Sequence, residues 1–182
     1  MASKPTITAT VTVARTRLFH VEQVELRFAN GREVSYERLK SKSSGGAVLV
    51  VPMLDAHTVL LIREYAAGVD RYELALPKGR VEEGEGIEAA ANREIREEVG
   101  HGARRLTRLK SLTLAPGYFS HATHIVLAED LYRDPLEGDE PEVLEVVPWP
   151  LADIADLVEQ EECTEARSIA ALYMVRERLL GR

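Results

Sequence analysis

Hydrophobic and polar residues alternate along most of the first part of the chain. Residues 6–14 and 20–28 follow this two-residue period, and β-branched side chains are frequent in the first of them. Such alternation predicts strands with one face exposed to solvent. An Asn-Gly pair at 30–31, a strong hairpin signal, precedes a third alternating segment at 33–39. We therefore expect a small antiparallel sheet, set off by a Ser-, Lys- and Gly-rich stretch at 40–46.

The pattern changes after this stretch. Residues 46–54 form a continuous apolar run, which is typical of a strand buried on both faces. A strand-rich centre with helices inserted and appended predicts an α/β or α+β layered domain. We therefore divide the chain into an amino-terminal sheet, 1–42, and a larger domain, 43–182. The other predicted elements are strands at 57–63, 106–114, 122–129 and 142–147, a helix at 86–99, and two amphipathic helices near the carboxyl end.

Composition limits the partners of the chain. Its 30 acidic and 23 basic residues give a formal net charge of −7, which disfavours binding to a nucleic-acid backbone. Cys163 is the single cysteine, so neither an intrachain disulfide nor a thiolate metal cluster is expected. The amino terminus lacks the apolar run of a secretory signal, and no stretch approaches the roughly 20 apolar residues needed to cross a bilayer. We expect a cytoplasmic protein without membrane contact.

Residues 79–100 combine a glycine-rich loop with a helix that carries closely spaced carboxylates. Glu94 and Glu98 lie four residues apart, so their side chains emerge side by side, and Glu97 flanks them. Like charges at this spacing destabilise a helix by about 0.2–0.5 kcal/mol per pair. A hard divalent cation such as Mg²⁺ removes the repulsion and also binds phosphate oxygens. The acidic protein can thereby receive an anionic substrate.

A short Glu/Arg run alone is most often a solvated helix face. The complete string, however, fits G-x5-E-x7-R-E-U-x-E-E-x-G, where U is a bulky aliphatic residue. Chance agreement at all of these positions is on the order of one in 10⁴ or less. The string resembles the signature of the Nudix hydrolase family, the Nudix box. The matching residues are Gly79, Glu85, Arg93, Glu94, Ile95, Glu97, Glu98 and Gly100.

This resemblance implies an α/β/α sandwich around a mixed sheet. It also implies Mg²⁺, or Mn²⁺, and a water molecule that attacks a phosphorus atom of a diphosphate. By position, Glu94 and Glu98 would be the principal metal ligands, and Glu97 a third ligand or a base. The remaining roles carried over are the Lys78 carbonyl as a further metal ligand, Gly79 opening the loop, Glu85 bracing it and Arg93 holding the carboxylates.

Features outside the box resemble the ADP-ribose and ADP-compounds hydrolases of the family. Pro116 lies sixteen residues beyond Gly100, and the amino-terminal sheet resembles one that this branch exchanges between the subunits of a homodimer. The resemblance implies substrates that contain ADP, such as ADP-ribose, NADH and diadenosine polyphosphates. It also implies contacts of Arg38 and Glu37 with adenosine, and of Arg63 and Tyr118 with the phosphates or the terminal ribose.

An acidic loop at 136–145 offers a catalytic base, as a loop glutamate does in this branch. Glu140 is our first candidate and Glu142 the second, and Glu97 competes from within the box. Glu137 and Asp139 lie in the same loop. The alternative to a base here is an exposed acidic turn.

Three other functions compete with an ADP-compounds hydrolase. Lys78 resembles a residue of dinucleoside polyphosphate hydrolases, whose activity overlaps with the first prediction. A housecleaning hydrolase of nucleoside triphosphates is disfavoured by Pro116 and by the amino-terminal sheet. A Nudix-fold binding module without catalysis is disfavoured because every carboxylate of the box is present, although fold alone does not decide function.

Overall fold

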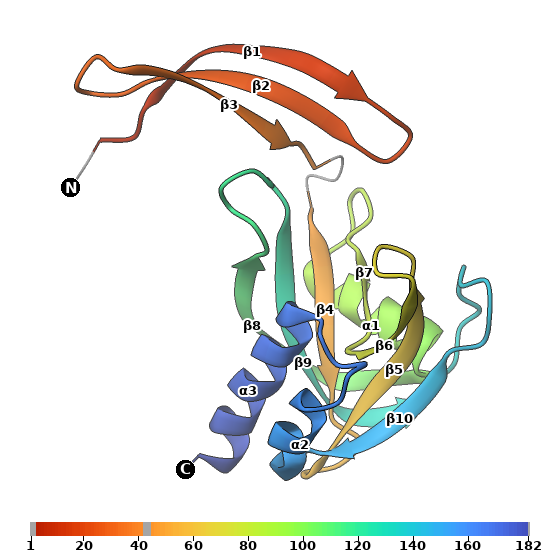
Figure 1. Ribbon diagram of the computed structural model, residues 1–182. Helices are drawn as coiled ribbons and strands as arrows, with labels where there is room; N and C mark the ends of the chain where they lie inside the picture. Colours follow the sequence, from red (N-terminus) through yellow and green to blue (C-terminus); the bar gives the residue numbers. More distant parts are fainter. Residues whose placement is uncertain (1–2, 42–44, 182) are drawn as a thin grey trace.

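The computed structural model describes residues 3–41 and 45–181. Figure 1 shows a curved three-stranded sheet above a larger layered α/β unit. The predicted boundary between residues 42 and 43 lies outside the described residues.

The amino-terminal sheet is antiparallel, in the order β1-β2-β3. Its strands, β1 (Thr6–Arg15), β2 (His20–Arg27) and β3 (Glu33–Leu39), confirm the three predicted segments. Gly31 adopts a φ of 81° in the β2–β3 turn, a conformation that favours glycine. Every residue of β1 is exposed to solvent. The sheet therefore has an uncovered surface.

A mixed four-stranded sheet lies at the centre of the larger unit. Its order is β7-β4-β9-β8, and the β4–β9 pair is parallel whereas the other pairs are antiparallel. The central strand β4 is buried at every residue, as the continuous apolar run predicts. The strands are β4 (Ala47–Pro52), β7 (Lys78–Arg80), β8 (His101–Thr113) and β9 (Ala122–Arg133).

A second, antiparallel sheet has the order β10-β5-β6 and contains β5 (Thr58–Ala66), β6 (Arg71–Ala75) and β10 (Glu145–Pro150). The strand predicted at 142–147 begins three residues later and includes Pro148 and Pro150. Proline is tolerated there because β10 is an edge strand that pairs only with β5. The sequence did not predict β6 and β7, which are only 5 and 3 residues long.

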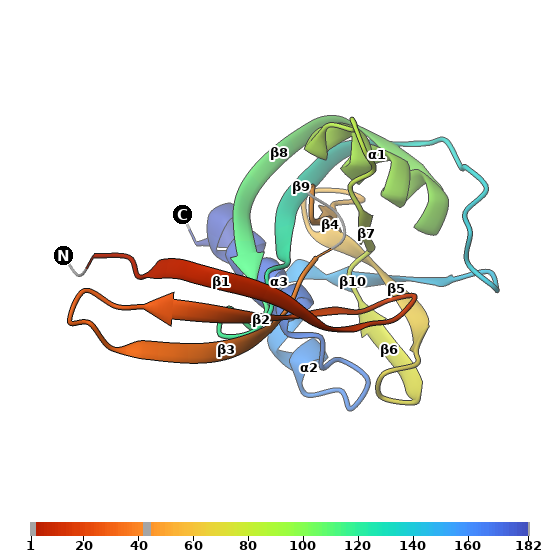
Figure 2. The same cartoon turned by 90° about the horizontal axis from the view of Figure 1, so that it is seen from above.

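Helices cover both sides of these strands. Alternate residues of β4 and β5 face two separate apolar clusters, one containing Ala91 and Ile95 of α1 (Ile87–Glu98), the other containing Ile154 of α2 (Ile154–Val158) and Leu172 of α3 (Ala166–Leu180). Figure 2 shows α1 and α3 on opposite sides of β4 and β9. This arrangement confirms the predicted α/β/α sandwich. Among the described helices, none is long and apolar enough to span a membrane.

Candidate active site

Packing of α1 on the mixed sheet places its carboxylates. Ala91 and Ile95 are fully buried in the core beneath the helix. Glu94 and Glu98 lie next to this buried face of the helix, and their side chains point towards β7. Only 8% of Glu94 and 6% of Glu98 is exposed. The predicted pair of adjacent carboxylates is therefore present, and it is largely removed from water.

Gly79 of β7 makes close approach to these carboxylates possible. A Cβ atom built on Gly79 would lie 2.1 Å from the Oε1 atom of Glu94, a distance that no side chain tolerates. The glycine that opens the box is thus required by contact with Glu94, in addition to any flexibility of the loop.

Arg93 connects the acidic groups of the box. Its Nη1 atom donates to Glu94 at 2.8 Å and to Glu97 at 2.9 Å, while Nε donates to Glu85 at 3.0 Å. Its Nη2 atom also donates to the carbonyl oxygen of Arg80 at 2.9 Å. The hydrogen bond from Arg93 lowers the pKa of Glu85. The guanidinium therefore links the loop, the helix and β7.

Burial opposes ionisation of the two central carboxyls. It raises the pKa of Glu98 to about 8, although the nearby Lys78 and its backbone N–H, which donates to Oε2 of Glu98 at 2.9 Å, lower it. Burial also raises the pKa of Glu94, against the effect of Arg93. Two desolvated carboxylates at one place require either protons or additional positive charge.

The side chain of Lys78 reaches across to the second sheet. Its Nζ atom lies 2.6 Å from Oε2 of Glu64 on β5. Sequence reasoning missed Glu64, because the contact depends on how β5 packs beside β7 and no spacing along the chain indicates it.

The acidic loop forms another wall of the site. It is attached at Leu136, whose N–H donates to the carbonyl oxygen of Arg96, and at Glu142, which accepts a hydrogen bond of 2.9 Å from the Tyr72 hydroxyl. Between these points Glu140 lines the cleft. Burial is the main cause that raises the pKa of Glu140, and the charges of Glu64 and Asp139 add to it. Of the two loop candidates, Glu140 therefore faces the cleft and Glu142 is held by Tyr72.

These elements line an open cleft of about 1410 Å³. It runs between β7, the glycine-rich loop, α1 and the acidic loop. Its lining includes Glu94 and Glu97 from the helix, Lys78 from β7, and Glu137, Asp139 and Glu140 from the acidic loop.

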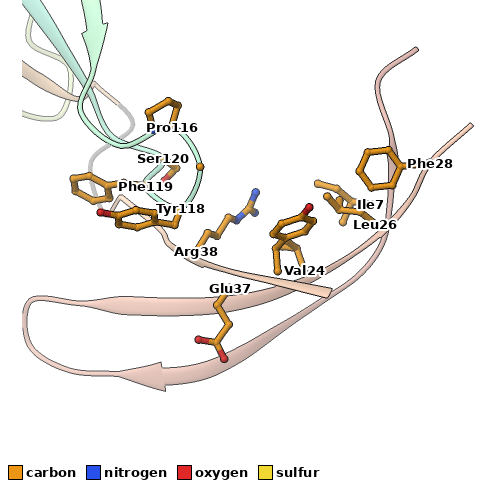
Figure 3. A pocket seen from close by; sticks show the side chains of 12 residues that line it. Ile7, Val24, Leu26, Phe28, Glu37, Arg38, Pro116, Tyr118, Phe119 and Ser120 are labelled. Carbon is orange, nitrogen blue, oxygen red and sulfur yellow. The ribbon is translucent and has the colours of Figure 1, made fainter. Parts of the chain in front are cut away.

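A second pocket, of about 380 Å³, lies between the amino-terminal sheet and residues 116–120 (Figure 3). Arg38 points into it and donates to the buried Glu22, while Tyr118 is 60% exposed at its rim. Glu37 extends to the opposite side of the sheet from Arg38, as strand alternation requires (Figure 3). The two neighbours predicted to bind adenosine together therefore diverge. Pro116 also lines the pocket.

Arg63 belongs to neither cavity. Its guanidinium pairs with Glu145 of β10 and with Glu162, on the side of the second sheet that faces α2 and α3. A role of Arg63 at the phosphates or the terminal ribose stays a prediction, since the structure does not bring it to the cleft.

Comparison with known proteins agrees with this geometry. The NUDIX domain matches residues 44–172, and the NudE-type Nudix hydrolase N-terminal domain matches residues 5–38. The chain belongs to the Nudix hydrolase family. It is 53% identical over 178 residues to the ADP compounds hydrolase NudE of Escherichia coli (strain K12), which covers 98% of this chain and 95% of that relative.

Other Nudix relatives are also similar over most of their length. The ADP-ribose pyrophosphatase of Bacillus subtilis (strain 168) is 32% identical over 174 residues, 91% of each protein. A crystal structure of an ADP compounds hydrolase superposes with a TM-score of 0.91 at 52% identity, covering 100% of this chain and 97% of the other. The whole chain, including the amino-terminal sheet, therefore shares its architecture with this group of Nudix hydrolases.

Nudix hydrolases of this kind generally need a divalent metal ion. Within the described residues, no three ligating side chains already converge on one point. The carboxylates of Glu94 and Glu97 are instead held by Arg93. The donor set nevertheless fits a hard cation, because all of its atoms are oxygens and Glu94 and Glu98 are buried without full compensation of charge.

Proposed function

We propose that this Nudix hydrolase is a Mg²⁺-dependent pyrophosphohydrolase that cleaves the diphosphate bond of ADP-containing compounds and releases AMP or another adenine nucleotide. ADP-ribose, NADH and diadenosine polyphosphates are the expected substrates. The observation that carries the proposal is the combination of the box carboxylates, with Glu85, Glu94 and Glu97 lining an open cleft and Glu98 buried beside Lys78, with a NudE-type amino-terminal sheet. The full-length similarity to an ADP compounds hydrolase supports it.

In this proposal Glu94, Glu98 and the Lys78 carbonyl hold Mg²⁺, or Mn²⁺, and Glu97 is the third carboxylate ligand. A bound divalent ion would lower the pKa of water and neutralise phosphate charge. Arg93 keeps Glu94 and Glu97 at fixed positions through its hydrogen bonds.

Glu140 is the proposed general base. Its pKa is raised by burial, which makes its carboxylate a better proton acceptor near neutral pH, and its side chain lines the cleft. Glu97 is a weaker candidate because it already accepts a hydrogen bond from Arg93. Glu142 is less suitable because Tyr72 occupies one of its oxygens.

The second pocket is the proposed site for the adenosine half. Its walls are largely apolar and aromatic, and the exposed ring of Tyr118 can stack on a base while Arg38 supplies hydrogen-bond donors. Glu37 also lines this pocket, although the end of its side chain extends to the other side of the sheet.

We also propose that the protein is a homodimer, with residues 1–42 as the dimerisation element and 43–182 as the catalytic domain. Ile7, Val11 and Val13 of β1 are about half exposed or more, and a second copy would remove them from water. The proposed compartment is the cytoplasm, in agreement with a single cysteine that is buried and free. Sedimentation velocity would test the dimer, and a monomer at micromolar concentration would contradict it.

Product analysis tests the proposed reaction. Purified protein is incubated, with and without Mg²⁺, separately with ADP-ribose, NADH, diadenosine triphosphate and dGTP. Metal-dependent release of AMP from ADP-ribose or NADH is expected. Release of pyrophosphate from dGTP alone would instead indicate a housecleaning hydrolase, and no product from any of the four would favour a binding module.

A further inference from the structure

The cleft is strongly acidic for a site that receives phosphates. Within residues 3–41 and 45–181, eight acidic residues line it, against three basic ones, Lys78, Arg80 and Arg93. Divalent ions would neutralise part of this charge, and among the described residues that line the cleft these three are the cations that can contact phosphate oxygens directly.

Two of the three cations are already engaged within the protein. The guanidinium of Arg93 donates to Glu85, Glu94, Glu97 and a carbonyl oxygen. The ammonium of Lys78 is paired with Glu64 at 2.6 Å. All five N–H donors of Arg93 are used in these contacts, so it cannot bind a new anion without giving up a partner. The ammonium of Lys78 keeps free donors, but its charge is already balanced by the carboxylate of Glu64.

Arg80 differs from both. Its residue is exposed, and among residues 3–41 and 45–181 no side chain or backbone group forms a hydrogen bond or an ion pair with its guanidinium. Its backbone, in contrast, is fixed, because Arg80 pairs with Ala47 of β4 and its carbonyl oxygen accepts from Arg93. A guanidinium with five N–H donors is thus carried on a rigid strand at the wall of the cleft.

The register of β7 separates this cation from the carboxylates. Gly79 faces Glu94, as the 2.1 Å approach of a Cβ atom at this position shows. Lys78 and Arg80, one residue to either side, therefore point to the other face of the strand. β7 is an edge strand of its sheet, and in the described part of the chain no second strand pairs with its outer edge. A phosphate chain crossing β7 would pass from the carboxylates on one side to Arg80 on the other.

We propose that Arg80 is a specificity-determining residue that binds a phosphate group beyond the two that flank the scissile bond. It thereby favours dinucleoside polyphosphates with three or more phosphates over ADP-ribose, which has a ribose at that place. The inference rests on the proposed function and names a preference within its substrates. The planar guanidinium suits this task because it can donate two parallel hydrogen bonds to one phosphate.

Steady-state kinetics of Arg80→Ala test the proposal, with ADP-ribose, diadenosine triphosphate and diadenosine pentaphosphate as substrates. For the two diadenosine compounds we expect kcat/KM to fall about tenfold or more, mainly through KM, as loss of a charge-assisted hydrogen bond implies. For ADP-ribose the change should stay below about threefold. Arg178→Ala, which removes the same charge from an exposed site on α3, should leave all three substrates unchanged.

Equal losses for all three substrates, or no loss for any, would overturn the proposal. A binding measurement separates it from the proposed function. In calorimetric titrations with inorganic tripolyphosphate and inorganic diphosphate, the wild type should prefer tripolyphosphate, and Arg80→Ala should reduce that preference about tenfold. If the wild type turned over no ADP compound but Arg80→Ala still lost this preference, the proposed function would fail and the phosphate site at Arg80 would stand. An unchanged preference would remove the site.

Discussion

The cleft and the second pocket are built in different ways. In the cleft, Arg93 links Glu94 of α1 to Glu85 of the glycine-rich loop and to the backbone of β7. The second pocket joins two parts of the chain that are hydrogen-bonded around Leu39 and residues 118–120, and Tyr118 at its rim is open to solvent. Bond cleavage requires fixed positions for charge, whereas recognition of a base requires a surface that it can enter. We therefore expect changes in the cleft to act on kcat and changes in the second pocket to act on KM.

The largest effect is expected from Glu98→Gln. The variant retains an acceptor for the Lys78 N–H but loses a charged metal ligand, so kcat should fall on the order of 10³-fold. Glu88→Gln, the same change at an exposed position of α1, should have no effect. Steady-state rates with ADP-ribose measure both variants, and near-normal turnover by Glu98→Gln would remove Glu98 from the metal site.

Although Glu98→Gln should lower activity, it should raise the stability of the metal-free protein. Burial raises the pKa of Glu98 to about 8, from 4.5, so ionisation of this group destabilises the folded, metal-free protein increasingly as pH rises between these values. Glutamine does not ionise. In EDTA, the Tm of Glu98→Gln should therefore exceed that of the wild type more at pH 8 than at pH 5, and a pH-independent difference would contradict the burial of a carboxylate there.

A smaller loss, roughly 10²-fold in kcat, is expected from Glu140→Gln, because the amide cannot accept the proton of water. The raised pKa of Glu140 predicts that the wild-type rate rises with pH through a value above 4.5, and the variant should lack this acidic limb. Glu142→Gln should retain it. The pH profiles of kcat distinguish the candidates, since loss of the limb in Glu97→Gln alone would assign the base to the box.

These residues differ in how far the sequence could predict them. The carboxylates of α1 follow from spacing on a single helix, and the structure places them as that spacing requires. Glu64 pairs with Lys78 of β7, and Arg80 belongs to β7 itself. This strand has only 3 residues, too few to show a hydrophobic period in the sequence. Arg63 and Glu37 were assigned by resemblance alone. Arg63 is paired away from the cleft, and Glu37 lines the second pocket while its carboxylate extends to the other side of the sheet. Local periodicity thus predicts a loop–helix site, but not contacts between separate sheets.

In the second pocket, Tyr118→Ala should raise KM for ADP-ribose about tenfold and leave kcat nearly unchanged, because stacking on a base contributes about 1–3 kcal/mol. Tyr118→Phe keeps the ring and should keep the affinity. Phe19→Ala removes an exposed aromatic side chain that does not line the pocket, and it serves as the control. A fall in kcat without a change in KM would contradict the assignment of substrate affinity to the second pocket and of bond cleavage to the cleft.

The smallest effect is expected at Tyr72, an exposed residue whose hydrogen bond holds the acidic loop. The Tyr72 hydroxyl holds Glu142 at 2.9 Å and so fixes one end of the loop that carries Glu140. Tyr72→Phe should lower kcat about two- to fivefold with KM unchanged, as loss of one partly exposed hydrogen bond implies. Tyr65→Phe is a matched control, because its ring packs edge to face on Tyr72 but its hydroxyl bonds to Asp70 instead of the loop.

A double-mutant cycle separates this contact from a general effect on the hairpin. If Tyr72 acts by holding the loop, adding Glu142→Gln to Tyr72→Phe should cost little further activity, whereas independent residues would give additive losses. The position of Glu140 would then depend on a hydrogen bond at the surface, whereas the carboxylates of Glu94 and Glu98 are held in place by burial. An equal loss of kcat in Tyr65→Phe would mean instead that the two rings support the hairpin and that the loop positions Glu140 without the Tyr72 hydroxyl.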